Sequence, residues 1–101
     1  MFQRQWKKWK MLLINLSKQS DKFCSTLDPK QYKQIVREIF KLAKNPDQND
    51  IKKIISEKNI SYYRKDVGEF RIIFKIDENI LYITVIGKRN DDSVYKIFKR
   101  K

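Results

Sequence analysis

The sequence predicts an α+β domain: two N-terminal helices packed on one face of a small, mainly antiparallel four-stranded sheet, with a short C-terminal helix. Apolar residues recur at helical spacing over 17–45, whereas 62–86 shows alternating or continuous apolar runs bounded by turn residues. The length of 101 residues suits one compact domain. We expect that domain over 11–101, preceded by a basic extension over 1–10.

The first strand and both helices are expected before residue 47. Residues 11–16 form a short apolar run that fits a buried strand. Ser17 is suited to cap a first short helix, and Asp28 followed by Pro29 is suited to begin a second. The second helix carries a broad apolar face and ends at an Asn-Pro pair. These helices therefore offer one face to a sheet.

The remaining elements are predicted from the second half of the chain. Residues 47–61 fit either a short helix over 50–55 or part of a long basic loop. After this segment the pattern predicts strands at 62–67, 69–76 and 80–86, turns at Gly68 and 77–79, and a short helix over 91–99.

One strand carries an arginine whose direction follows from the period of two. Phe70, Ile72 and Phe74 alternate with Arg71, Ile73 and Lys75. The aromatic set is expected to face the helices. Arg71 is therefore predicted to point from the opposite face of the sheet.

The net charge of +12 indicates a polyanionic partner. RNA, DNA, an anionic membrane and an acidic protein all fit such a charge. A solvated lysine-rich surface without any such partner fits it as well. Composition alone does not choose among these partners.

The cysteine and histidine content narrows the chemistry. Cys24 is the single cysteine and there is no histidine, which argues against a disulfide framework, a zinc site or a Ser-His-Asp triad. We expect Cys24 to be a buried structural thiol and the site to need neither metal nor cofactor. The apolar run over 11–16 is too short to cross a membrane, so we expect a cytoplasmic protein without a membrane partner.

Four residues form a candidate site: Arg64, Arg71, Arg89 and Tyr95. Guanidinium groups neutralise charge on phosphate oxygens, and a tyrosine ring stacks on bases or assists proton transfer. In RNA the 2′-hydroxyl itself can attack the phosphate, so the set suits metal-free cleavage. A solvated strand arginine and a core tyrosine are the simpler interpretations. Further RNA-binding charge is expected from Lys65, Lys88, Lys96 and Lys99.

The sequence resembles the RelE/ParE toxin superfamily of type II toxin–antitoxin systems. The resemblance is carried by the residues from Tyr63 to Phe74 and from Ile86 to Tyr95, and more loosely by the residues upstream. It implies a small α+β domain, a cognate antitoxin partner, and cleavage of mRNA on the ribosome without a metal. The products implied are a 2′,3′-cyclic phosphate and a 5′-hydroxyl.

The resemblance also implies roles for the site residues. Arg71 matches a strand arginine that stabilises the phosphate in the transition state, and Arg89 matches the arginine after a Gly-Lys pair. Tyr95 matches a tyrosine that stacks on or activates the nucleotide. Arg64 falls near a lysine that acts as general acid in the best-known member, and Tyr62 takes the place of a second lysine. Arginine hardly deprotonates, so the proton donor stays open.

Two other functions fit the same resemblance. One is a ParE-like inhibitor of DNA gyrase, which shares the fold and is not expected to need the arginines and the tyrosine. The other is a non-catalytic domain that binds RNA or an antitoxin.

Overall fold

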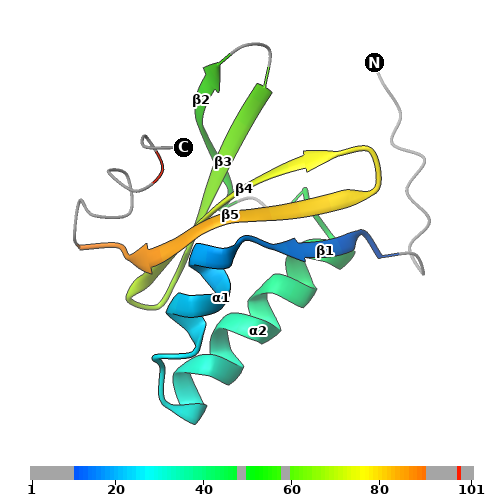
Figure 1. Cartoon of the computed structure of the whole chain (residues 1–101). Coiled ribbons are helices and arrows are strands. Elements are labelled where there is room, and N and C mark those ends of the chain that lie inside the picture. The colour runs from blue at the N-terminus through cyan, green and yellow to red at the C-terminus, as the bar shows by residue number, and fades with distance from the viewer. Residues whose placement is uncertain (1–10, 48–49, 58–59, 91–97, 99–101) are drawn as a thin grey trace.

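The computed structural model describes residues 11–47, 50–57, 60–90 and 98. Along the chain its elements are β1 (Leu13–Leu16), α1 (Lys18–Cys24), α2 (Pro29–Lys44), β2 (Lys52–Glu57), β3 (Ile60–Val67), β4 (Phe70–Asp77) and β5 (Ile80–Lys88). The strands form one sheet in the order β1-β5-β4-β3-β2. Strand β1 runs parallel to β5, and the other neighbouring strands are antiparallel. Figure 1 shows both helices on one side of this sheet.

The expected four-stranded sheet is wrong, because the sheet has five strands and is mixed. The additional strand is β2, which lies in the segment whose pattern fitted a helix or a loop. Its register against β3 shifts between Lys53 and Ile55. This irregularity interrupts the period of two by which a strand is recognised in a sequence. No helix after β5 belongs to the described fold. The expected helix over 91–99 falls outside the described residues, Phe98 apart.

Both predicted helix caps are confirmed. The Ser17 hydroxyl accepts a hydrogen bond from the backbone N–H of Ser20 at 3.1 Å, and it donates one to the carbonyl of Thr84 at 2.7 Å. The Asp28 carboxylate accepts one from the backbone N–H of Gln31 at 2.8 Å. Each cap satisfies a donor that the first turn of a helix leaves without a helical partner.

Helix α1 is held to the sheet through backbone groups of β5. The side chain of Gln19 donates to the carbonyl of Ile86 at 3.0 Å and accepts from the N–H of the same residue at 3.1 Å. These two bonds replace the pairing that β5 loses where β1 ends at Leu16. The end of β5, which leads to Arg89, is therefore fixed from the helix side.

The core lies between the helices and the sheet. Helix α2 contributes buried Ile35, Ile39 and Leu42, and β4 contributes Phe70, Ile72 and Phe74. The alternation predicted for β4 is confirmed, because Phe70, Ile72 and Phe74 face the helices while Ile73 faces the other way. On that opposite face Ile73 and Val85 form a second cluster, and Phe98 packs against it. The same core encloses the single cysteine, Cys24, as expected, and burial raises the pKa of its thiol.

Gly68 makes the turn between β3 and β4. Its φ of +58° lies in the left-handed region, where a side chain is strained. A Cβ atom there would also lie 2.9 Å from Nε2 of Gln34 on α2. The two-residue loop pairs Val67 with Phe70 and then Asp66 with Arg71. The turn therefore places a carboxylate directly opposite the predicted site arginine.

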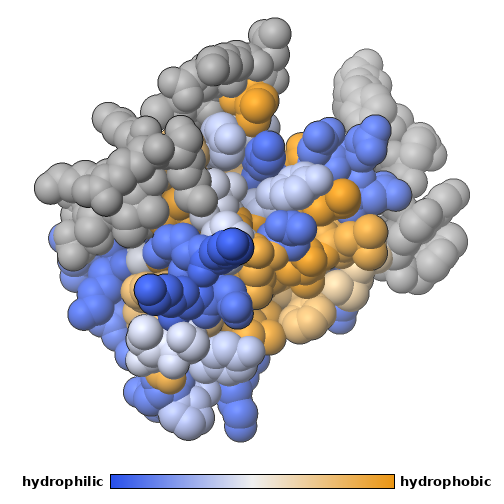
Figure 2. Space-filling view, viewed as in Figure 1, coloured by the Kyte–Doolittle hydropathy of each residue, from blue (hydrophilic) through white to orange (hydrophobic). Residues whose placement is uncertain are grey.

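Strand β1 carries the most exposed apolar side chains of the described sheet. Leu13 is 64% exposed and Leu16 is 41% exposed. Figure 2 shows hydrophobic side chains gathered on this side of the molecule, around β1. Within the described residues, no helix is long and apolar enough to cross a membrane.

Candidate functional site

An ion pair between Asp66 and Arg71 forms the centre of the candidate site. Nε of Arg71 lies 2.7 Å from Oδ1 of Asp66, and Nη2 lies 3.2 Å from Oδ2. The Arg71 side chain is only 13% exposed and that of Asp66 is 33% exposed. Such a two-point pair fixes both the position and the plane of the guanidinium group. The hydrogen bonds from Arg71 hold the pKa of Asp66 below its usual range.

Arg89 approaches the same carboxylate from the end of β5. Its Nη1 lies 3.7 Å from Oδ2 of Asp66, and its side chain is 47% exposed. The backbone N–H of Arg89 donates to the carbonyl of Glu69 in the β3–β4 turn at 2.9 Å. Gly87, the strand partner of Arg71, has no side chain to stand beside the guanidinium group. Two of the predicted arginines therefore meet at one carboxylate.

Arg64 lies on the same face of β3 as Asp66, two residues earlier. Residues two apart on a strand point to the same side, about 7 Å from one another. The positive charge of Arg64 also helps to lower the pKa of Asp66. A hollow of about 50 Å³ is lined by these two residues, by Lys52 at the start of β2 and by Asp50, which precedes that strand. The structure thus brings Arg64, Arg71 and Arg89 around Asp66.

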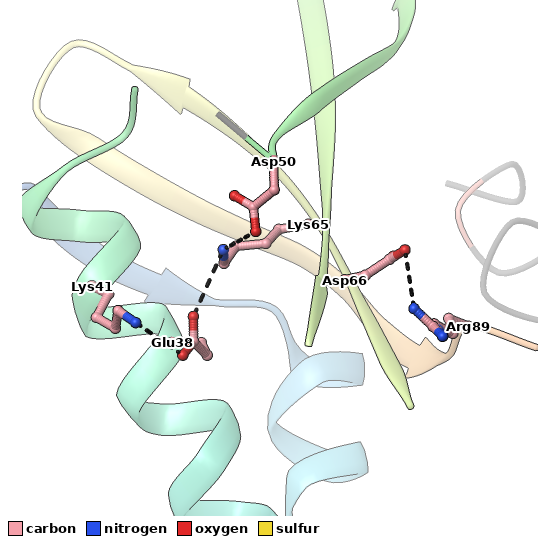
Figure 3. A network of polar contacts seen from close by, with 6 residues as sticks. All are labelled: Glu38, Lys41, Asp50, Lys65, Asp66 and Arg89. Atoms are coloured by element: carbon pink, nitrogen blue, oxygen red, sulfur yellow. Dashed lines mark hydrogen bonds and ion pairs between the residues drawn. The ribbon is translucent and has the colours of Figure 1, made fainter. Parts of the chain in front are cut away.

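Lys65 lies apart from this cluster. Its side chain is 5% exposed, and its ammonium group donates to Asp50 at 2.8 Å and lies 3.7 Å from Glu38 of α2. Figure 3 shows Lys65 and Asp66 pointing to opposite sides of β3, the lysine toward α2 and the carboxylate toward Arg89. The bond from Lys65 lowers the pKa of Asp50. Lys65 therefore ties the sheet to α2, and its burial leaves it no surface for RNA.

The other predicted residues divide into two groups. Lys88 is exposed at the end of β5, next to Arg89. Tyr95, Lys96 and Lys99 lie outside the described residues. The described part of the site is therefore the arginine cluster, defined as Arg64, Arg71 and Arg89 around Asp66.

Asp66 is the residue that sequence reasoning missed. Its signal was the turn itself, because in a two-residue hairpin centred on Gly68 and Glu69 the residues at 66 and 71 are strand partners. Opposite charges at such a pair attract across the strands. The sequence pattern therefore held the information that Arg71 has a carboxylate partner.

Beside the arginine cluster, the same face of the sheet carries a lysine between two tyrosines. Nζ of Lys75 lies 5.9 Å from the ring centre of Tyr62 and 5.2 Å from that of Tyr82. The ring of Tyr62 also meets that of Phe98 edge-on at 4.7 Å. Tyr62, which replaces an expected lysine, thus takes part in packing and in a cation–π contact.

A larger cavity of about 570 Å³ lies at the other end of β3 and β4, away from the arginine cluster. Its lining includes Pro46, Ile51, Tyr63, Phe74 and Asp77. Tyr63 and Phe74 stack there with ring centres 5.8 Å apart. Among the described residues, no predicted site residue borders this cavity.

The arrangement of the arginine cluster suits a phosphate. Nη2 of Arg71 and Nη1 of Arg89 both contact Oδ2 of Asp66, so their separation cannot exceed the sum of the two contact distances. A phosphate spans such a gap, since its oxygens accept charged hydrogen bonds at about 2.7–2.9 Å. The cluster can therefore bind a phosphodiester and stabilise charge that develops on it.

The chain matches no known family model and no curated protein by sequence. Several solved structures nevertheless share its fold. A RelE–RelB complex from Pyrococcus horikoshii OT3 aligns over 79% of this chain and 97% of the matched chain, with a TM-score of 0.68 and 19% identity. A RelBE2 toxin–antitoxin complex from Mycobacterium tuberculosis aligns over 80% and 94%, with a TM-score of 0.66 and 17% identity.

The isolated RelE toxin of E. coli also aligns, over 88% of this chain and 97% of that toxin. The TM-score is 0.64 and the identity is 17%. The resemblance read from the sequence is therefore confirmed at the level of the fold: this chain has the fold of the RelE toxins.

Proposed function

We propose that this chain is the toxin of a type II toxin–antitoxin system and that it cleaves mRNA on the ribosome without a metal. The observation that carries the proposal is the arginine cluster on the face of a RelE fold that the helices leave uncovered. Several structures of this fold are complexes with RelB, which supports a cognate antitoxin as partner.

The chemistry is an internal transfer within the RNA. The 2′-oxygen bonds to the neighbouring phosphorus while the bond from phosphorus to the 5′-oxygen breaks. The 2′-hydroxyl loses its proton and the leaving 5′-oxygen gains one, which gives a 2′,3′-cyclic phosphate and a 5′-hydroxyl. In this scheme Arg71 and Arg89 neutralise the charge that grows on the phosphate oxygens.

Contact with the nucleobase is assigned to a residue outside the arginine cluster. We assign base stacking to Tyr95, by position after Arg89. Arg64 adds charge beside the phosphate, and its permanent protonation makes it a poor proton donor. Lys88 is exposed beside Arg89, but it is the strand partner of Phe70, which faces the helices, so we expect it to contact the RNA backbone at the edge of the sheet and not within the arginine cluster.

The test is inducible expression followed by mapping of mRNA 5′ ends. We expect growth arrest with new 5′ ends inside translated messages, and loss of both effects when Arg71 and Arg89 are replaced by alanine. Removing charge from a phosphate site typically costs about 100-fold or more in rate.

A matched control removes two cations from the opposite side. Arg37 and Lys41 are exposed on α2, so replacing both by alanine changes the net charge equally without touching the arginine cluster. This variant should keep full toxicity. Growth arrest with intact mRNA, or inhibition of gyrase in its place, contradicts the proposed function.

A further inference from the structure

Asp66 is a carboxylate at the centre of a site proposed to bind an anion. A negative group in that place opposes phosphate binding by its charge. It nevertheless makes the shortest side-chain ion pair of the arginine cluster, at 2.7 Å to Nε of Arg71. A role for this residue has to explain both facts.

The contacts show what Asp66 does to the arginines. Oδ1 and Oδ2 both bond to Arg71, which leaves its side chain with one orientation. Oδ2 also faces Nη1 of Arg89. Arg71 and Arg89 carry like charges and would repel one another on the same face. A carboxylate between them offsets that repulsion and keeps them close.

The backbone makes this arrangement rigid. Asp66 and Arg71 are strand partners beside a two-residue turn, and the N–H of Arg89 is bonded to the turn carbonyl of Glu69. The three side chains thus stand on one hairpin and the adjacent strand end. Groups held in place before substrate arrives need no reorganisation during the reaction.

We propose that Asp66 is a positioning residue that orients the guanidinium groups of Arg71 and Arg89 toward one phosphate of single-stranded RNA. This inference rests on the proposed function for its substrate. Asp66 itself neither donates a proton nor bonds to the phosphate. Its negative charge weakens the binding of RNA, whereas its bonds to the arginines improve their orientation in the transition state.

These two effects should act on different kinetic constants, the charge on KM and the orientation on kcat. Replacing Asp66 by asparagine removes the negative charge and keeps the shape, so RNA should bind at least as tightly and KM should not rise. The guanidinium groups lose their charged partner, so kcat should fall by about 10–100-fold, as expected for a misplacement of about 1 Å. A residue that only competes with phosphate would instead give an unchanged or higher kcat.

The experiment measures kcat and KM for cleavage of a defined mRNA on programmed ribosomes by the purified full-length protein. Glu38→Gln is the matched control, because Glu38 also faces two cations, Lys41 at 3.4 Å and Lys65 at 3.7 Å, on the helix side. It should leave both constants unchanged. A kcat for Asp66→Asn within twofold of wild type, or an equal loss in Glu38→Gln, overturns the proposal.

A second measurement does not depend on cleavage. Side-chain NMR should show slow hydrogen exchange at Nε of Arg71, which is bonded and mostly buried, and faster exchange in Asp66→Ala. Glu38→Gln should keep the slow exchange. If wild type cleaves no mRNA, the proposed function fails on its own. Unchanged Arg71 exchange in Asp66→Ala would then refute the positioning role, and faster exchange would support it.

Discussion

At the scale of single residues, the site depends on one carboxylate that balances several cations. Asp66 bonds to Arg71 and faces Arg89, and its pKa is lowered chiefly by the hydrogen bonds from Arg71. Lys65, the preceding residue, points to the other face and bonds to Asp50. Alternation along one strand therefore sends one charged residue to the site and its neighbour to the scaffold.

The lowered pKa of Asp66 predicts how stability depends on pH. A carboxylate whose pKa is lower in the folded protein stabilises it above the unfolded pKa, about 3.9, and loses this effect as pH falls through the folded value. At pH 7, Asp66→Asn should therefore lower the free energy of unfolding, by no more than about 1 kcal/mol for a partly exposed pair.

Urea unfolding of both proteins from pH 7 to pH 2 checks this prediction. The difference between wild type and Asp66→Asn should be constant above pH 5 and should shrink below about pH 4. A difference that stays constant down to pH 2 would show that Asp66 titrates alike in the folded and unfolded chains.

At the scale of elements, the two helices are attached to the sheet in different ways. Helix α1 is short and is held by polar bonds from Ser17 and Gln19 to β5. Helix α2 is long and is held by buried side chains such as Ile35 and Leu42. The caps of the two helices should therefore differ in their contribution to stability.

A pair of cap substitutions tests this difference. Asp28→Ala removes only a cap and should lower the free energy of unfolding by about 1 kcal/mol. Ser17→Ala also removes the bond to Thr84, so its loss should exceed that of Asp28→Ala by about 1 kcal/mol. Chemical denaturation measures both values. Asp28→Asn, which keeps the capping oxygen, should stay near wild type, and equal losses for the two alanine variants would contradict the argument.

The sequence predicted elements better than it predicted the sheet. Caps at Ser17 and Asp28 and the turn at Gly68 follow from local chemistry, and all three were found. Strand β2 was missed because a strand with an irregular register at the sheet edge has no clean period. The meeting of Arg71 and Arg89 depends on the pairing of β4 with β5, which sequence suggests only as a hairpin. The contacts of Asp66 with both arginines depend on the register of β4 against β3 and β5, and the sequence alone does not give the register with β5.

At the scale of the whole molecule, charge is divided between the two faces of the sheet. The net charge is +12, and the described cations that converge lie on the face opposite the helices. On the helix side, Lys41 of α2 pairs with Glu38. Nucleic acid should therefore distinguish one face from the other.

Salt dependence of binding checks that distinction. For single-stranded RNA, the logarithm of the association constant falls with the logarithm of salt concentration by about 0.7 for each phosphate contact. Arg89→Ala should reduce this slope by about 0.7, because it removes one exposed cation from the site. Lys41→Ala should leave the slope unchanged. Fluorescence anisotropy of a labelled RNA from about 50 to about 300 mM salt, about threefold below and twofold above the physiological value, measures both. Equal slopes for the two variants would contradict the assignment of the binding face.

The parallel pairing of β1 with β5 has a consequence for synthesis of the chain. The bond between Ser17 and Thr84 joins residues 67 positions apart, and it lies at the junction of these two strands. Because a polypeptide is made from its N-terminus, the first strand emerges long before its partner has been decoded. The β3–β4 hairpin closes a short loop, whereas the β1–β5 pair must close a loop of 67 residues, about two thirds of the chain. The sheet of a growing chain therefore stays unfinished until β5 has been made, and Arg89 is the last member of the arginine cluster to be added.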